Sequence, residues 1–270
     1  MRSPMGTGRG LLAIGASIAV SGCGPLSVTE ERHLGDQFEY QMRSELPLLH
    51  DRVISRYVSE MGEGLIRASG PQPFRYRFYV VRDEEINAFA GPAGHVYVHT
   101  ETILRARDAS ELAGVLAHEV AHVQQRHIAA NYNRARNARI GTDILALGAG
   151  VFGGGVAGSA TALGGGLAAN TWLNSFSREA ELEADEFSVG TMVRAGWDPN
   201  GLVSFFESLA QEEDSSVPAF LSSHPATQER IEAARAEIQR LDGTRGLASD
   251  DGGKLEIIQR RIRLLTGSHR

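Results

Sequence analysis

The sequence predicts a mainly helical α+β fold in which a small β-sheet lies beside the helices, and three observations support this prediction. Apolar residues recur at helical spacing along most of the chain, and two short stretches alternate apolar and polar residues as strands do. The sequence contains no visible internal repeat of the kind that would predict a solenoid. With 270 residues and 42% hydrophobic content, the chain can bury a sizeable core in one main domain.

Residues 1–22 have the pattern of a secretory signal. Arg2 and Arg9 precede an apolar run over 11–20, and small residues then lead to Cys23. The apolar run is too short to span a bilayer by itself. We therefore expect residues 1–22 to be a signal peptide that is absent from the mature fold.

Cys23 is the expected site of a lipid anchor. The stretch Val20-Ser21-Gly22-Cys23 resembles the bacterial lipobox, whose cysteine is diacylated and becomes the new N-terminus. It is the only cysteine, so no intramolecular disulfide can form. Gly24 stands where inner-membrane lipoproteins often carry aspartate. The resemblance therefore implies anchoring at the periplasmic face of the outer membrane, while a plain cleavage site with a stray cysteine is the alternative.

Two amphipathic helices are expected first, at about residues 27–46 and 51–69, with Pro47 and Gly70 as stops. Two strands follow in the alternating stretches 74–83 and 94–100. The expected turn between these strands has the sequence Ala-Gly-Pro-Ala-Gly.

Helical spacing returns in the second half of the chain. Ser110 is a plausible N-cap for a long helix that runs to about residue 140. Further helices are expected at 177–196, 200–213, 226–241 and 255–265. These elements suggest a domain over 23–242, followed by a C-terminal tail, 243–270, that contains the last short helix.

The segment 144–169 differs from the rest of the chain because it carries no charge and is dense in glycine. Its length would allow a membrane segment, but each glycine costs about 1 kcal/mol relative to alanine inside a helix. A helical hairpin or flap near the active site, a membrane contact and a disordered linker all remain open readings.

The stretch His-Glu-Val-Ala-His at 118–122 places titratable groups on an Ala- and Val-rich helix. His118 and His122 are four residues apart, so their side chains lie on one helix face and can share a metal ion. Glu119 projects about 100° round the helix from His118, where a carboxylate can take a proton from water beside the metal. This spacing is the zinc protease signature.

A catalytic zinc needs a third protein ligand. His127 would lie about 140° from His122 on a continuous helix, so we expect a structural or surface role for it. Glu181 and Asp185 lie four residues apart on a later helix. This spacing suits a ligand and a carboxylate that accepts an N–H from a ligating histidine. Glu183 is the rival ligand.

Several motifs in order resemble the M48 peptidase family, the gluzincins that include HtpX-like and CAAX prenyl endopeptidases. They are His-Glu-Val-Ala-His, the stretch Asn-Ala-Phe-Ala-Gly before it, Ser-Arg-Glu-Ala-Glu-Leu-Glu-Ala-Asp, Ala-Gly-Trp-Asp-Pro and Ser-Ser-His-Pro-Ala-Thr. The resemblance covers about residues 27–240 and is strongest to the periplasmic lipoprotein branch. It implies a zincin-like metalloprotease domain with one Zn²⁺ per chain.

The resemblance also assigns roles to residues. His118, His122 and Glu181 would bind zinc, Glu119 would be the general base, and Asp185 would support a ligating histidine. Two further residues are candidates, namely His224 in the last of these motifs and Arg230 shortly after it. His224 could donate to the oxyanion or cover the metal as a fourth ligand, and Arg230 could orient Glu181 or His224, or form a surface ion pair.

Substrate contacts are expected along the strand at 94–100. If it offers an exposed edge through Val96 and Val98, an extended polypeptide could pair with it, which would favour unfolded or misassembled envelope proteins. Asn87 could help to hold that polypeptide.

The net charge of −6 and the single lysine, Lys254, provide no basic stripe, so nucleic acid is not an expected partner. The leading hypothesis is a zinc endopeptidase with a role in envelope quality control, with polypeptides as substrates and contact with the membrane through the anchor. The alternatives are a lipid-anchored periplasmic chaperone or assembly factor with a closed, structural zinc site, and an integral membrane protease that spans through 144–169. The sequence does not predict an oligomeric state.

Overall fold

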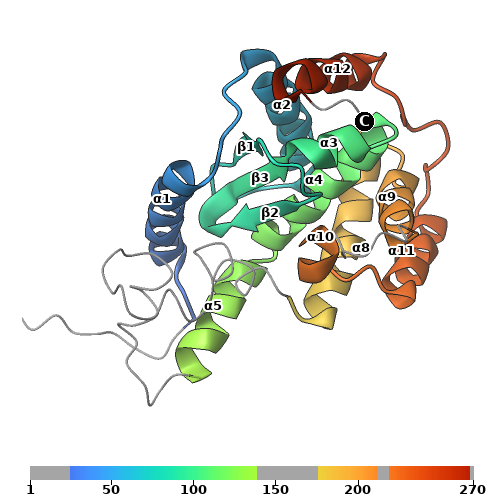
Figure 1. Ribbon diagram of the computed structural model, residues 1–270. Coiled ribbons are helices and arrows are strands. Elements are labelled where there is room, and N and C mark those ends of the chain that lie inside the picture. The colour runs from blue at the N-terminus through green and yellow to red at the C-terminus, as the bar shows by residue number, and fades with distance from the viewer. Residues whose placement is uncertain (1–24, 139–175, 212–218, 268–270) are drawn as a thin grey trace, which may run out of the picture.

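The computed structural model describes residues 25–138, 176–211 and 219–267 (Figure 1). The helices are α1 (Val28–Glu45), α2 (Arg52–Ser69), α3 (Thr100–Arg105), α4 (Ala109–Gln124), α5 (His127–Ala138), α8 (Arg178–Ala195), α9 (Asn200–Ala210), α10 (Ala219–Ser223), α11 (Gln228–Arg240) and α12 (Lys254–Thr266). The strands are β1 (Arg77–Val81), β2 (Ala88–Gly91) and β3 (His95–His99), with a short 3₁₀ turn at Pro92–Gly94. The expected mainly helical α+β fold is confirmed.

The sheet has three strands in the order β1-β3-β2, and β3 lies in the centre. β1 runs parallel to β3, with Arg77 opposite His95, and β2 runs antiparallel to it, with Gly91 opposite His95. The expectation of two strands separated by a turn was therefore incomplete. Ala88–Gly91 forms a strand of four buried residues, and so it lacks the apolar–polar alternation by which strands are found in a sequence.

Helices cover the two faces of the sheet. On one face, Phe38 and Met42 of α1 pack against Val81, Phe89 and Tyr97. The opposite face belongs to the main core, which also contains residues of α2, α4, α8, α9 and α11. Figure 1 shows α1 on the left of the sheet and α4 crossing behind it. The sheet therefore separates Phe38 and Met42 of α1 from the main core.

Helix α4 is the central element of the fold, because every residue from Ala109 to Val123 is buried. Asp108 begins it by accepting a hydrogen bond from the backbone N–H of Glu111 at 3.0 Å. Asp108 is the N-cap in place of the expected Ser110, whose hydroxyl instead donates to Asp108. α8 and α9 pack closely on α4, and a Cβ on Gly114 would lie 2.8 Å from Cα of Leu202.

The expected long helix from Ser110 to residue 140 is in fact two helices. α4 ends at Gln124, α5 begins at His127, and Arg126 between them has a φ of 56°. This is the left-handed region, which residues other than glycine rarely adopt. The helix is interrupted at this point, shortly after the expected metal-binding motif.

The segment after residue 242 contributes to the main core. Leu255, Ile258 and Ile262 of α12 are buried there, and the side-chain amide of Gln259 donates to the carbonyl of Ala106 at 2.7 Å. The last helix is therefore an integral part of the packed structure.

In the part of the chain that the structure describes, no helix combines the length and the apolar character that crossing a membrane requires. The expected signal peptide 1–22, Cys23 and the glycine-rich segment 144–169 lie outside the described residues.

Candidate metal centre

Helix α4 brings the first two expected ligands together. His118 and His122 lie one helical turn apart, and their Nε2 atoms are 3.0 Å from each other. Both side chains are completely buried. The four-residue spacing therefore produces the arrangement expected from the sequence, with both rings turned toward one point.

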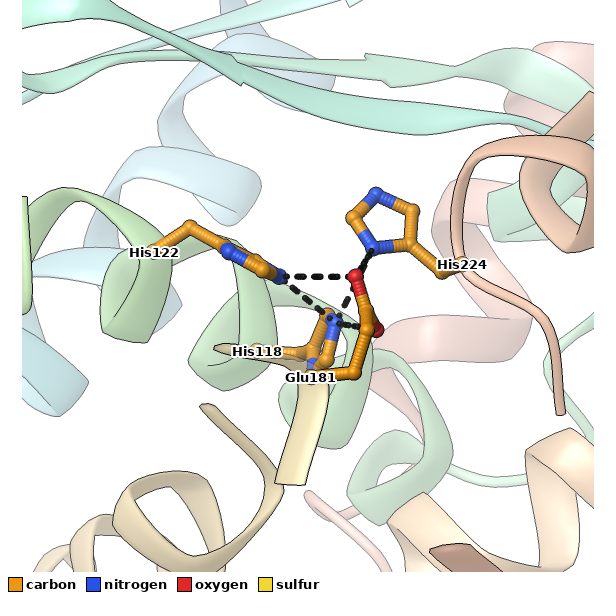
Figure 2. Close-up of side chains that lie close together, drawn as sticks. All are labelled: His118, His122, Glu181 and His224. Carbon is orange, nitrogen blue, oxygen red and sulfur yellow. Dashed lines mark hydrogen bonds and ion pairs between the residues drawn. The ribbon is translucent and has the colours of Figure 1, made fainter. Parts of the chain in front are cut away.

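Helix α8 contributes a carboxylate to the same point. Ser177 caps this helix by accepting a hydrogen bond from the N–H of Ala180, and Glu181 lies in the first turn. The Oε2 atom of Glu181 is 3.3 Å from Nε2 of His118, and its Oε1 atom is 3.6 Å from Nε2 of His122. Figure 2 shows the three side chains converging from two helices.

His224, which follows α10, completes the cluster. Its Nδ1 atom lies 3.2 Å from Nε2 of His118 and 3.0 Å from Oε1 of Glu181, and the side chain is completely buried. In Figure 2 its ring lies against Glu181 from the side opposite His122. His224 therefore occupies the fourth corner of the group.

Glu119 lies next to this group. Its Oε1 atom is 3.6 Å from Nε2 of His224, and it is completely buried. Within the described residues, neither of its carboxylate oxygens has a hydrogen bond of normal geometry. Burial raises the pKa of the Glu119 carboxyl, although the nearby His224 and His118 act against this rise. A carboxyl with a raised pKa is suited to accept and return a proton.

A buried ion-pair network supports the cluster from the side of α11. Arg230 is only 2% exposed, and its Nε and Nη2 atoms donate to the two oxygens of Asp185 at 2.7 and 2.8 Å. Its Nη1 atom lies 2.8 Å from Oε2 of Glu181. Asp185 Oδ1 in turn lies 3.0 Å from Nδ1 of His118. Arg230 thus holds two carboxylates that face the histidines, and it does not form a surface ion pair.

The cluster fits a metal ion. One candidate ligand atom from each of His118, His122, Glu181 and His224 lies within 4.8 Å of all the others. Three buried imidazole rings that meet in this way need a cation or a proton between them, because unpaired polar groups are costly in the interior. Nitrogen ligands from histidine with one carboxylate are a set that zinc prefers.

The two candidate imidazole ligands on α4 differ in their charge when no metal is bound. Burial and the neighbouring His118 hold the pKa of His122 well below its ordinary value, so this ring is neutral. For His118, burial acts to lower the pKa, but hydrogen bonds with Asp185 and Glu181 outweigh it and raise the pKa to about 9. In the metal-free protein a proton on His118 therefore supplies the positive charge, and a bound metal ion would displace it.

Two expectations about residues near the metal change with the structure. His127 does not point away from His122, because the helix break at Arg126 turns it back, and its Nδ1 lies 3.0 Å from Nδ1 of His122. Glu183, the rival ligand, is exposed and lies 3.3 Å from Nε2 of His127. Sequence reasoning also missed Phe176, whose ring stacks on His122 with centroids 3.8 Å apart.

The expectation of an exposed substrate-binding edge at Val96 and Val98 was wrong. Both residues are completely buried, and β3 is hydrogen-bonded to a strand on each side, so no polypeptide can pair with it. His95 and His99 on the same strand are also buried. Asn87, immediately before β2, stays a candidate because its buried Oδ1 has no hydrogen-bond partner within the described residues.

The fold and the site together define a class of protein. The site combines two imidazoles one turn apart on a buried helix, a carboxylate from a second helix and a neighbouring glutamate. This combination is typical of the active site of a metallopeptidase. Residues 54–238 match Peptidase family M48, a range that covers more than half of the chain. The chain belongs to this family.

The chain is similar in sequence to several proteins that are named as proteases. The chain is 31% identical over 225 residues to the beta-barrel assembly-enhancing protease of Escherichia coli strain K12, which covers 80% of this chain and 45% of that protein. It is 27% identical over 211 residues to the metalloprotease LoiP of the same strain, and this match covers 78% of this chain and 81% of LoiP. It is also 32% identical over 193 residues to the mitochondrial metalloendopeptidase OMA1 of Schizosaccharomyces pombe, and this match covers 69% of this chain and 53% of OMA1. The chain thus spans about half the length of the assembly-enhancing relative.

Proposed function

We propose that this protein is a zinc-dependent endopeptidase that hydrolyses unfolded or misassembled proteins of the bacterial envelope. The observation that carries the proposal is the buried group of His118, His122 and Glu181 with Glu119 beside it. Membership of a peptidase family and the similarity to named metalloproteases support it.

His118, His122 and Glu181 would hold one zinc ion per chain. Two neutral imidazoles and one carboxylate would leave a net charge of about +1 on the site. When bound, zinc would supply Lewis-acid chemistry that activates water and polarises the scissile carbonyl. Asp185 Oδ1 lies 3.0 Å from Nδ1 of His118, where it would accept the Nδ1 proton and keep the lone pair of Nε2 directed at the ligand position.

Glu119 is the proposed general base. It would take a proton from the attacking water and return it to the leaving amine, which makes it base and acid in turn. Its burial beside the cluster keeps bulk water away from this proton and raises the carboxyl pKa toward the working range.

His224 is the proposed control element of the site. With Nδ1 among the candidate ligand atoms and Nε2 facing Glu119, its ring fills the space that water and substrate would need. We propose that the conformation seen here is a closed resting state. Substrate would have to displace His224 from this position before it could reach the metal site and Glu119.

Replacing His224 with alanine should raise kcat/KM for an unfolded substrate such as casein. If about one molecule in ten is open at rest, removing the ring should raise the value by about tenfold. The measurement compares initial rates of fluorescent casein hydrolysis at equal zinc content, with the exposed His50→Ala as the control. Loss of activity with zinc retained would instead assign His224 the role of oxyanion donor.

Strand β2 is the proposed docking edge for substrate, in place of β3. It lies at the edge of the sheet, and Ala90 of this strand is next to Glu119. An extended polypeptide paired with this edge would pass the general base, and recognition of main chain suits unfolded substrates. The free side-chain oxygen of Asn87 would hold the same polypeptide.

The proposed location is the periplasmic face of the outer membrane, with a lipid anchor on Cys23. The lipobox-like stretch supports this proposal, and so does the similarity to the beta-barrel assembly-enhancing protease. Replacing Cys23 with serine should release the protein from membranes into the soluble periplasmic fraction. Retention of Cys23→Ser with the membrane after a high-salt wash would contradict the anchor.

The closed arrangement of four candidate ligands favours one alternative, a periplasmic chaperone or assembly factor in which zinc is structural. The two readings differ in their need for Glu119. If Glu119→Gln preserves the cellular role of the protein, the chaperone is supported and the protease is not.

A further inference from the structure

His127 lies against a metal-binding residue only because the helix is interrupted. On a continuous helix the side chain would point about 140° away from His122. Between Gln124 and His127, however, Arg126 adopts a φ of 56°, and α5 begins as a separate helix. As a result, His127 is buried, with its Nδ1 atom 3.0 Å from Nδ1 of His122.

A partly buried ion pair with another part of the chain holds this interruption in place. Nε of Arg126 donates to Oε2 of Glu31 at 2.8 Å, and its Nη2 donates to the carbonyl of Leu26. Glu31 is 1% exposed. Because no glycine is present at the break, these contacts with Glu31 of α1 and with Leu26 are what favour the left-handed conformation at Arg126.

His127 is placed to accept a hydrogen bond from the Nδ1 proton of His122. A histidine that ligates a metal through Nε2 carries its proton on Nδ1, and that proton needs an acceptor. The atom placed to accept it is Nδ1 of His127. His127 must then carry its own proton on Nε2, and this atom lies 3.3 Å from Oε2 of Glu183.

We propose that His127 is a positioning residue for the metal, which accepts the Nδ1 proton of His122 and is itself oriented by Glu183. The inference rests on the proposed zinc site. It gives the two ligating histidines unequal support. His118 faces a carboxylate clamped by Arg230, whereas His122 faces an imidazole whose far nitrogen reaches an exposed carboxylate.

The first test is the zinc dissociation constant of the full chain, measured by competition with a chromophoric chelator. His127→Leu removes the acceptor and should weaken zinc binding by about 10–100-fold. His127→Asn should restore binding close to that of the wild type, because the amide oxygen can take the place of Nδ1. His50→Leu, an exposed histidine, is the matched control and should have no effect.

Glu183 provides a second, milder variant. Glu183→Gln weakens the acceptor that orients His127 and should reduce zinc affinity less than His127→Leu does. Glu186→Gln, an exposed glutamate on the same helix, should leave the affinity unchanged. Equal zinc affinity in the wild type and His127→Leu would overturn the positioning role while leaving the proposed function intact. Absence of zinc binding by the wild type would overturn both.

The tautomers provide a test that needs no variant. In the zinc-loaded wild type, long-range ¹H–¹⁵N spectra should show His122 protonated on Nδ1 and His127 protonated on Nε2 alone. A proton on Nδ1 of His127 would overturn the inference, because that atom could not then accept from His122. This result remains decisive even if His127→Leu fails to fold.

Discussion

Glu119→Gln is expected to lower the rate of casein hydrolysis by about 10²–10⁴-fold, the range of a general acid–base contribution. Glutamine has nearly the same shape as glutamate but cannot take up a proton from water. Because Glu119 is not one of the clustered candidate ligands, the zinc content should stay at the wild-type level. The measurement is the initial rate at saturating and limiting substrate, with metal analysis of the same preparation.

The control for this substitution is Glu186→Gln, which makes the same chemical change at an exposed position of α8. It should leave both the rate and the zinc content unchanged. Full activity of Glu119→Gln with normal zinc would show that another group accepts the proton, and the proposed mechanism would be wrong.

Arg230→Met is expected to lower the free energy of unfolding of the metal-free protein by about 3–5 kcal/mol, the usual cost of removing one partner from a buried ion pair. Arg230 is 2% exposed and neutralises both Asp185 and Glu181. Although burial acts to raise it, hydrogen bonds from Arg230 and His118 hold the pKa of Asp185 below its ordinary value. Without the guanidinium, two carboxylates stay buried with only the histidines as partners.

Urea denaturation measures this effect, and α11 offers a matched control. Arg235→Met removes a half-exposed arginine that pairs with Glu207, so its cost should be below about 1 kcal/mol. Arg230→Lys should fall between the two, because an ammonium group cannot bind both oxygens of Asp185 as the planar guanidinium does. Equal stability of Arg230→Met and Arg235→Met would contradict the role given to Arg230.

The centre of the site could be predicted from the sequence because it depends on residue spacing within single helices. Two histidines four residues apart must share a face of a helix, and Glu181 and Asp185 obey the same rule on α8. The ends of that helix were also predictable, since Ser177 caps it and Gly196 ends it with a φ of 87°.

The rest of the site depends on contacts between distant parts of the chain. The break at Arg126 has no local signal, because an ion pair with the distant Glu31 holds it. The position of His127 follows from that break. Arginine is rarely buried, so the interior location of Arg230 contradicts the usual preference and depends on two carboxylates of α8.

The position of β3 in the sheet could not be predicted from the sequence either. The alternation in residues 94–100 suggested a half-exposed strand, but both faces of β3 are covered, by α1 on one side and by the main core on the other. The polar residues of that alternation, His95 and His99, are buried as well. Pairing order is set by the whole fold, so the sequence pattern of one strand could not place it at the centre.

The most direct test of the account is an anomalous difference map at the zinc absorption edge, from crystals of the chain grown with zinc. The account predicts one ion per chain at about 2.0–2.2 Å from Nε2 of His118, Nε2 of His122 and a carboxylate oxygen of Glu181. No ion among these three side chains, or one bound elsewhere on the chain, would contradict it.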